Sequence, residues 1–204
     1  MRWISVASDV EVASRGLDDF GQRQVPFATA LALTWTAQDA QSGVQDSLAR
    51  RFTLRNNWVR SGIRITAAKK GDPVAVVGSI ETFMGKQETG GSKTARSHSR
   101  VAIPVEAKRN KRDIIPKGQR PGALKGKPRI LARNGSNLIP IGSGFAILQR
   151  AGKDRYPLKA LYRFKGSVQI KPRFGFKGTV SDIVARRFAS NMVRALDQAK
   201  ASAR

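Results

Sequence analysis

The sequence predicts an α+β fold, in which a mainly antiparallel sheet is combined with N-terminal and C-terminal amphipathic helices and a long basic Gly/Pro-rich arm. Three observations predict it. Apolar residues recur at helical spacing near both ends of the chain, short segments between them alternate apolar and polar residues, and the middle is crowded with Lys, Arg, Gly and Pro. With 204 residues that are 40% hydrophobic, we expect a single domain over 1–204, with the arm at 86–133 inserted within it.

The first predicted element is a helix from Pro26 to about Arg50. Proline is well tolerated in the first turn of a helix, and apolar residues then follow at spacings of three and four. This periodicity indicates one buried face. The residues expected in the core or in contacts between subunits are Phe27, Leu31, Val44 and Leu48.

Short strands are expected next, because alternation of apolar and polar residues is typical of half-buried strands. On the N-terminal side of the arm they are predicted at 52–54, 62–66 and 74–80, and on its C-terminal side at 144–150 and 156–164. The last two flank a short loop with a glycine, Gly152, which predicts a hairpin.

A second amphipathic helix is predicted over about 181–200. Thr179 or Ser181 can cap its N-terminus, and Asp182 is favourably placed against the helix dipole. Its apolar stripe predicts a second set of core or subunit-contact residues: Ile183, Val184, Phe188, Met192 and Leu196.

Charge is the most unusual property of the chain. It carries 38 Lys and Arg against 14 Asp and Glu, a net charge of +24. Residues 1–50 have a net charge of −2, whereas 86–133 hold fourteen basic residues against three acidic ones. Since Gly and Pro there disfavour regular structure, we expect an extended or partly disordered arm with a short strand near 101–105.

The arm is expected to contact a polyanion, either DNA or an acidic protein partner. Its deletion over 107–129 should then leave the rest of the chain folded. The residues predicted to make the contact are Lys108, Arg109, Lys111, Arg112, Lys117, Arg120, Lys125, Lys127, Arg129 and Arg133.

No catalytic constellation is apparent, and we expect no enzyme, no cofactor and no metal site. The chain has no cysteine and a single histidine, His98, inside the arm. The glycines at 89–94 lack the spacing of a phosphate-binding loop, and Asp18 and Asp19 are adjacent rather than paired across a site. No run of apolar residues is long enough to span a membrane.

Composition alone leaves an alternative open, a sequence-nonspecific RNA- or DNA-binding protein associated with ribosomes or the nucleoid. Against it, the nearly neutral first 50 residues and their amphipathic helix favour protein contacts. A nuclease is a weaker alternative, because carboxylate and histidine clusters are missing.

Two segments carry a resemblance to a known family. The hairpin loop runs Arg150-Ala-Gly-Lys-Asp-Arg-Tyr-Pro157, and the end of the first helix leads into Phe52-Thr-Leu-Arg-Asn-Asn-Trp-Val59. In order and spacing the chain resembles the tail-completion proteins (minor tail protein Z) of long-tailed bacteriophages.

The resemblance implies a structural virion protein of the neck or tail, made in the host cytoplasm, that completes the tail or joins it to the head. Such a protein is expected to form a homo-oligomeric ring, most commonly six-fold. Its expected partners are the tail terminator, the tail tube and head-completion proteins, and a ring of basic arms would lie where the packaged DNA ends.

Overall fold

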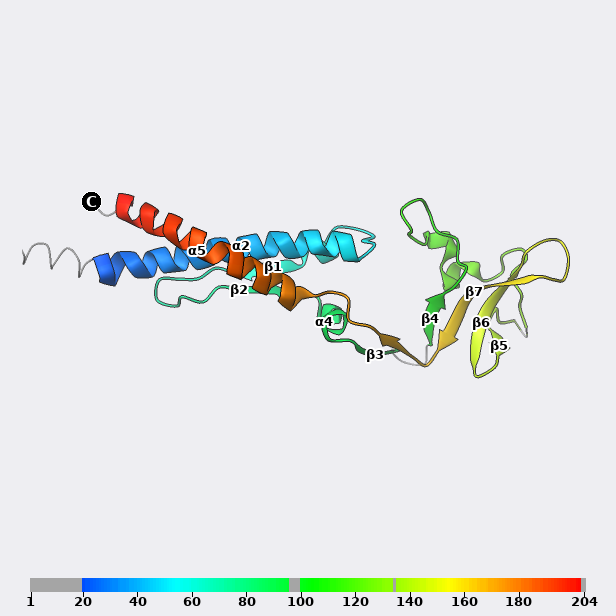
Figure 1. Cartoon of the computed structure of the whole chain (residues 1–204). Coiled ribbons are helices and arrows are strands. Elements are labelled where there is room, and N and C mark those ends of the chain that lie inside the picture. The colour runs from blue at the N-terminus through cyan, green and yellow to red at the C-terminus, as the bar shows by residue number, and fades with distance from the viewer. Residues whose placement is uncertain (1–19, 96–99, 134, 203–204) are drawn as a thin grey trace, which may run out of the picture. The chain divides into compact units, whose positions relative to one another are not determined.

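The computed structural model describes residues 20–95, 100–133 and 135–202 (Figure 1). Contacts divide these residues into two compact units. Unit 1 comprises the described residues within 1–50, 56–82 and 175–204, and unit 2 comprises those within 51–55 and 83–174. The α+β class, with antiparallel sheets and helices at both ends of the sequence, is confirmed. The single domain with an inserted arm at 86–133 stays a prediction.

Unit 1 is built mainly from two long helices. A short π-helical turn, η1 (Phe20–Gln24), leads into α2 (Val25–Arg51), and the last element is α5 (Phe176–Ser202). Both helices were predicted, but α5 begins earlier than residue 181. Neither predicted cap therefore acts as one. The Thr179 hydroxyl instead donates to the carbonyl of Gly175 at 2.8 Å, within the first turn.

Helices α2 and α5 pack antiparallel, so that the start of one contacts the end of the other (Figure 1). At the contact, Ala28 and Ala32 of α2 meet Ala195 and Ala199 of α5, and all four are fully buried. Small side chains at a contact allow two helix axes to approach closely. Larger, partly buried side chains surround this alanine contact: Leu31, Trp35, Phe188, Met192 and Leu196.

The buried residues of this helix contact differ in part from the core residues that the sequence predicted. Val44 and Leu48 are fully buried. Phe27 and Val184 are 40% and 41% exposed, so within the single chain they are not part of the buried core. The helices bury their alanine-rich faces instead, and a contact of these two side chains with another subunit stays a prediction.

A polar contact joins the same two helices near their middle. The side-chain amide of Asn191 in α5 donates to the hydroxyl of Thr36 at 3.1 Å and to a carboxylate oxygen of Asp39 at 2.9 Å. Asn191 and Thr36 are buried, and a buried polar group that loses its partner destabilises the fold. The contact therefore favours one alignment of α5 along α2.

A two-stranded hairpin packs along α2. It follows the single turn α3 (Trp58–Ser61) and pairs β1 (Ile63–Thr66) with β2 (Val76–Ser79), with Ile63 opposite Ser79. Ile63 is fully buried, and its carbonyl accepts a hydrogen bond from the Gln41 side chain of α2 at 2.6 Å. The strands predicted at 62–66 and 74–80 are thus confirmed.

The strand predicted at 52–54 is wrong, because these residues form no strand. Phe52 instead packs edge-on against Phe174 within unit 2, with 6.4 Å between the ring centroids. Phe174 is buried, and its backbone N–H donates to Gln87 of α4 (Thr82–Thr89) at 2.8 Å. Residues 52–54 are therefore held by an aromatic contact and not by strand pairing.

Unit 2 contains two antiparallel sheets. In the larger one the strand order is β4-β7-β6-β5, and a separate pair joins β3 to β8. The bounds are β3 (Gly91–Thr94), β4 (Val101–Pro104), β5 (Ile139–Ile141), β6 (Gly144–Arg150), β7 (Leu158–Lys165) and β8 (Ser167–Ile170). The hairpin β6–β7 and the short strand near 101–105 are confirmed. Strand β7 starts only after Pro157, which has no N–H for a ladder.

The core of unit 2 includes part of the segment predicted to be an arm. Ala107 and Leu124 are buried against Ile147, Leu161 and other side chains of β6 and β7. Leu124 ends one of two 3₁₀ turns, η2 (Lys117–Gln119) and η3 (Pro121–Leu124). A deletion of 107–129 would therefore remove core side chains, and charge substitutions are the better test of the basic residues.

Candidate interaction surfaces

The first basic surface is a closed loop that follows β4. The Asn110 side-chain oxygen accepts hydrogen bonds from the backbone N–H groups of Arg112 (3.0 Å) and Ile114 (2.9 Å), which holds the turn. Arg109 forms an exposed ion pair with Asp113 at 3.0 Å. We call this segment, residues 108–114, the basic loop. It leaves three exposed cations that form no ion pair within the described residues: Lys108, Lys111 and Arg112.

The second group of predicted contact residues lies around η2 and η3. Lys117, Lys125 and Lys127 are exposed, and Lys127 donates to the carbonyl of Gly118. Arg120 is half-buried, and its Nε atom is buried without a hydrogen-bond partner in the described part of the chain. It is therefore less available to a partner than the lysines are.

Tyr162 of β7 links these turns to the sheet through a hydrogen bond. It is 3% exposed, and its hydroxyl donates to the carbonyl of Gln119 at 2.8 Å. Burial raises the pKa of the Tyr162 hydroxyl because it disfavours the phenolate, while the cations of Arg109 and Arg120 lower it less strongly. The basic segment is thus held to the sheet by a neutral phenol.

A third basic feature is a pocket at one end of the β6–β7 hairpin. Arg129, Arg150 and Arg155 line a cavity of about 410 Å³ together with Tyr156. Its remaining lining residues are the apolar Ile130, Leu131, Ala132 and Leu158. The sequence predicted a contact only for Arg129. Arg150 ends the first predicted strand of the hairpin and Arg155 is the last residue of its predicted loop, and this placement was the available signal that they share one end of the hairpin.

Arg133, the last predicted contact residue, is exposed. Its backbone exchanges hydrogen bonds with Ser136, with its N–H donating at 2.7 Å and its carbonyl accepting at 3.0 Å. It does not line the arginine pocket.

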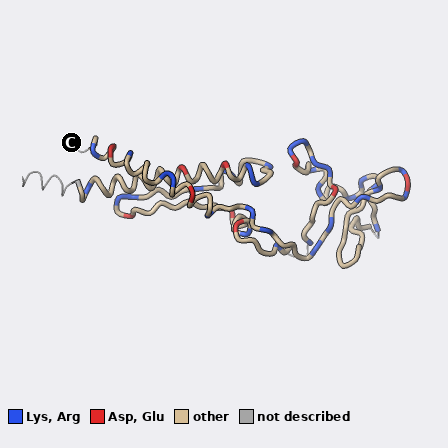
Figure 2. The backbone as a smooth tube through the Cα atoms, viewed as in Figure 1, with Lys and Arg blue, Asp and Glu red and all other residues tan. Residues whose placement is uncertain are grey.

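The positive charge is concentrated in unit 2 (Figure 2). Sequence positions 51–55 and 83–174 carry 24 Lys and Arg against 4 Asp and Glu, a net charge of +20. The remaining positions carry 14 against 10, a net charge of +4. Charge patterning along the sequence indicated the basic segment but not the strongly basic strands and loops that follow it.

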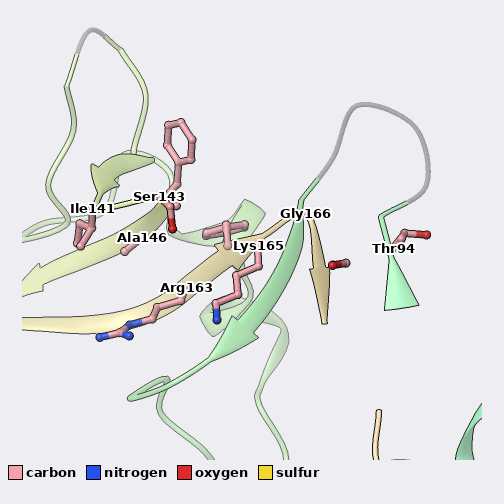
Figure 3. Close-up of a pocket in the computed structure, with 12 residues that line it drawn as sticks. Thr94, Ile141, Ser143, Ala146, Arg163, Lys165 and Gly166 are labelled. Atoms are coloured by element: carbon pink, nitrogen blue, oxygen red, sulfur yellow. The ribbon is translucent and has the colours of Figure 1, made fainter. Parts of the chain in front are cut away.

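A larger cavity of about 760 Å³ lies between the end of the β6–β7 sheet and the β3–β8 pair (Figure 3). Arg163 and Lys165, at alternate positions of β7, line it together with the hydroxyl-bearing residues Ser143 and Thr94. No carboxylate or imidazole is among its lining residues. The positive charge of Arg163 and Lys165 suits an anionic ligand.

Unit 1 also exposes several apolar side chains. Val74, Val76 and Ile80 are 56%, 53% and 61% exposed. Their alternate spacing places them on one face of the segment that contains β2. Trp58 of α3 and Val193 of α5 are also more than half exposed. Grouped exposed apolar residues are typical of surfaces that bind another protein.

Two further observations on the described residues concern metal binding and membrane spanning. Among them, no three His, Cys, Asp or Glu side chains lie close enough together to hold a metal ion. None of the helices in the same residues has both the length and the hydropathy needed to span a bilayer.

The described residues thus combine antiparallel strands, a strongly basic unit and a second unit with exposed apolar side chains. The family model of prophage minor tail protein Z (GPZ) matches residues 9–200, nearly the whole chain, and the protein belongs to this family. It is therefore a structural protein of a phage tail, and its partners include other tail proteins. Comparison with curated proteins and with solved structures gave no match.

Proposed function

We propose that this tail protein completes the tail or joins it to the head, as a ring of identical copies whose basic units contact DNA. The observation that carries the proposal is the separation of charge, with a net +20 on unit 2 and +4 on the rest of the chain. A polyanion neutralises such a surface and releases its counterions, which favours binding without reading sequence. An acidic neighbouring protein is the competing ligand.

Unit 1 supplies the contacts between copies and with neighbouring proteins of the tail or head. Val74, Val76 and Ile80 offer an apolar face that a single chain leaves in water. Closed cyclic symmetry satisfies such faces without leaving one open, and it matches the symmetry of a tail tube. We expect a hexamer, with the tail terminator, the tail tube and head-completion proteins as neighbours in the virion.

The DNA contact is tested by removing charges without removing core residues. The triple substitution Lys108→Gln, Lys111→Gln and Arg112→Gln takes three exposed cations from the basic loop. Arg64→Gln, Lys69→Gln and Lys70→Gln take three exposed cations from unit 1 and give the same net charge. Duplex DNA binding is measured by fluorescence anisotropy over a series of salt concentrations.

The basic-loop variant is expected to bind more weakly. The slope of log K against log salt should decrease by about 2 to 3, because each phosphate that a cation neutralises contributes about 0.9 to it. The unit 1 variant should keep nearly the wild-type slope. An equal weakening of both variants would mean that net charge alone acts, and would contradict a DNA surface on unit 2.

Ring formation is tested by light scattering at low and high salt, with and without a short duplex. A discrete oligomer that Val76→Lys and Ile80→Lys dissociate supports the assembly. A wild-type monomer that binds RNA and DNA tightly would contradict the ring. If the Val76→Lys and Ile80→Lys variants bound equally tightly, the general nucleic-acid-binding class would be favoured.

A further inference from the structure

The arginine pocket of Arg129, Arg150 and Arg155 has the chemistry of a ligand site. All three arginines line one cavity of about 410 Å³, a volume within the range of roughly 300–1,000 Å³ typical of ligand pockets. Asp154, in the same hairpin loop, is not among the lining residues. Within the described chain none of the three arginines forms an ion pair.

Backbone hydrogen bonds link the segments that carry the three arginines. The N–H of Arg150 donates to the carbonyl of Arg129 at 2.9 Å, and the N–H of Leu131 donates to Leu148 at 3.0 Å, so residues 129–131 extend the edge of β6. At the other side, Ala151 donates to Pro157 at 3.0 Å and closes the loop that carries Arg155. Like charges on adjacent strands repel each other, and an anion between them reverses that cost.

The rim of this pocket adds an aromatic ring. Tyr156 is 65% exposed, and the Arg155 guanidinium lies 5.8 Å from its ring centroid. Guanidinium groups form paired hydrogen bonds with phosphate oxygens, and an exposed tyrosine ring stacks with a base. A carboxylate-rich peptide would use the arginines but not the ring, and duplex DNA keeps its bases stacked inside the helix.

We infer that this pocket binds a single nucleic-acid strand, with a phosphodiester between Arg129, Arg150 and Arg155 and a neighbouring base stacked on Tyr156. The inference rests on the proposed contact of unit 2 with DNA, and it assigns that contact a strand-selective part. The basic loop contacts phosphates of either form of DNA, whereas the arginine pocket favours the single strand.

The test measures binding of the full-length chain to a labelled thymidine oligonucleotide of about 12 nucleotides, a length within the usual site sizes, and to a duplex of equal length. Arg150→Gln with Arg155→Gln is compared with Lys153→Gln with Lys159→Gln. The second pair removes the same charge from exposed residues of the same hairpin that do not line the pocket. Tyr156→Ala is compared with Tyr156→Phe, which keeps the ring. Circular dichroism and thermal midpoints verify that each variant is folded.

Arg150→Gln with Arg155→Gln should weaken single-strand binding about tenfold or more, and the lysine pair by less than about threefold. Tyr156→Ala should weaken single-strand binding about tenfold and leave duplex binding nearly unchanged, while Tyr156→Phe should change neither by much.

Equal effects of the arginine and lysine pairs would overturn the pocket as the binding site. The basic-loop variant would still report separately on the DNA contact. An effect of Tyr156→Ala that is absent, or equal for duplex, would overturn the single-strand ligand. Preferential displacement of the oligonucleotide by an acidic peptide would do the same. Failure of the wild-type protein to bind any DNA would overturn both proposals.

Discussion

The two units of this protein differ in how their interiors pack and in which side chains they expose. In unit 1, α2 and α5 meet through four alanines and a buried asparagine, and the unit exposes apolar side chains. In unit 2, large side chains such as Leu124 and Ile147 fill a core, and most of its lysines and arginines are exposed. The exposed apolar side chains of the first unit are of the kind that protein contacts cover. The second suits a polyanion, because a rigid core holds the cations in place against their own repulsion.

The largest expected effect tests whether the basic segment belongs to the core of unit 2. Leu124→Ala removes a side chain that is 2% exposed and should lower the free energy of unfolding by about 2 to 5 kcal/mol. Lys125→Ala, at the exposed neighbouring position, should change it by less than about 0.5 kcal/mol. Urea unfolding checks both. If the two variants were equally stable, the segment would be an unpacked arm and the contrast between the units would weaken.

The next effect concerns the polar contact in unit 1. Asn191→Ala leaves the Asp39 carboxylate and the Thr36 hydroxyl without their donor, at an expected cost of about 1 to 3 kcal/mol. Ser190→Ala, one residue away on the exposed face, is the matched control. Thermal unfolding of the two variants gives the comparison. Equal midpoints would show that the alanine contact alone aligns the helices.

The sequence predicted the long helices and the β6–β7 hairpin because their patterns repeat over many residues. It missed the alanine face of α2, since periodicity gives more weight to large side chains such as Phe27 than to Ala28 and Ala32. It also missed the packing of 86–133. Ala107, Ile115, Leu124 and Ile130 contact one core at irregular spacing, and only the folded sheet brings them together.

The candidate interaction surfaces were also predictable only in part from the sequence. Clustered lysines and arginines in the sequence indicated the basic loop. Arg150 and Arg155 are separated by a loop, and their approach to Arg129 depends on a backbone bridge between residues 129–131 and β6. Spacing along the chain does not reveal a bridge of that kind.

A smaller effect tests the tether between the sheet of unit 2 and its basic turns. Tyr162→Phe removes the hydrogen bond to Gln119 and should cost about 1 kcal/mol at neutral pH. Because burial raises the pKa of Tyr162 above its unfolded value near 10, the native state favours the protonated phenol. That stabilisation is complete below about pH 10 and is lost as the pH rises through the folded pKa.

The wild-type advantage over Tyr162→Phe should therefore shrink above about pH 10. Chemical unfolding of both proteins across this range gives the difference, in which the titration of lysines common to both cancels. A constant difference would indicate that the phenol is not buried against the sheet.

The smallest effect examines how closely the helices of unit 1 approach. Gly43 of α2 faces Ile183 of α5, and a methyl group at Gly43 would collide with the Cδ1 atom of Ile183. The next atom, Cγ1, would lie at an ordinary 3.5 Å. Gly43→Ala adds helix propensity worth about 1 kcal/mol, which the collision offsets. In an Ile183→Val background the Cδ1 atom is absent, so Gly43→Ala should then stabilise by about 1 kcal/mol. A double-mutant cycle in urea measures this coupling. Equal effects of Gly43→Ala in both backgrounds would show that the helices are farther apart at this level than at the alanines.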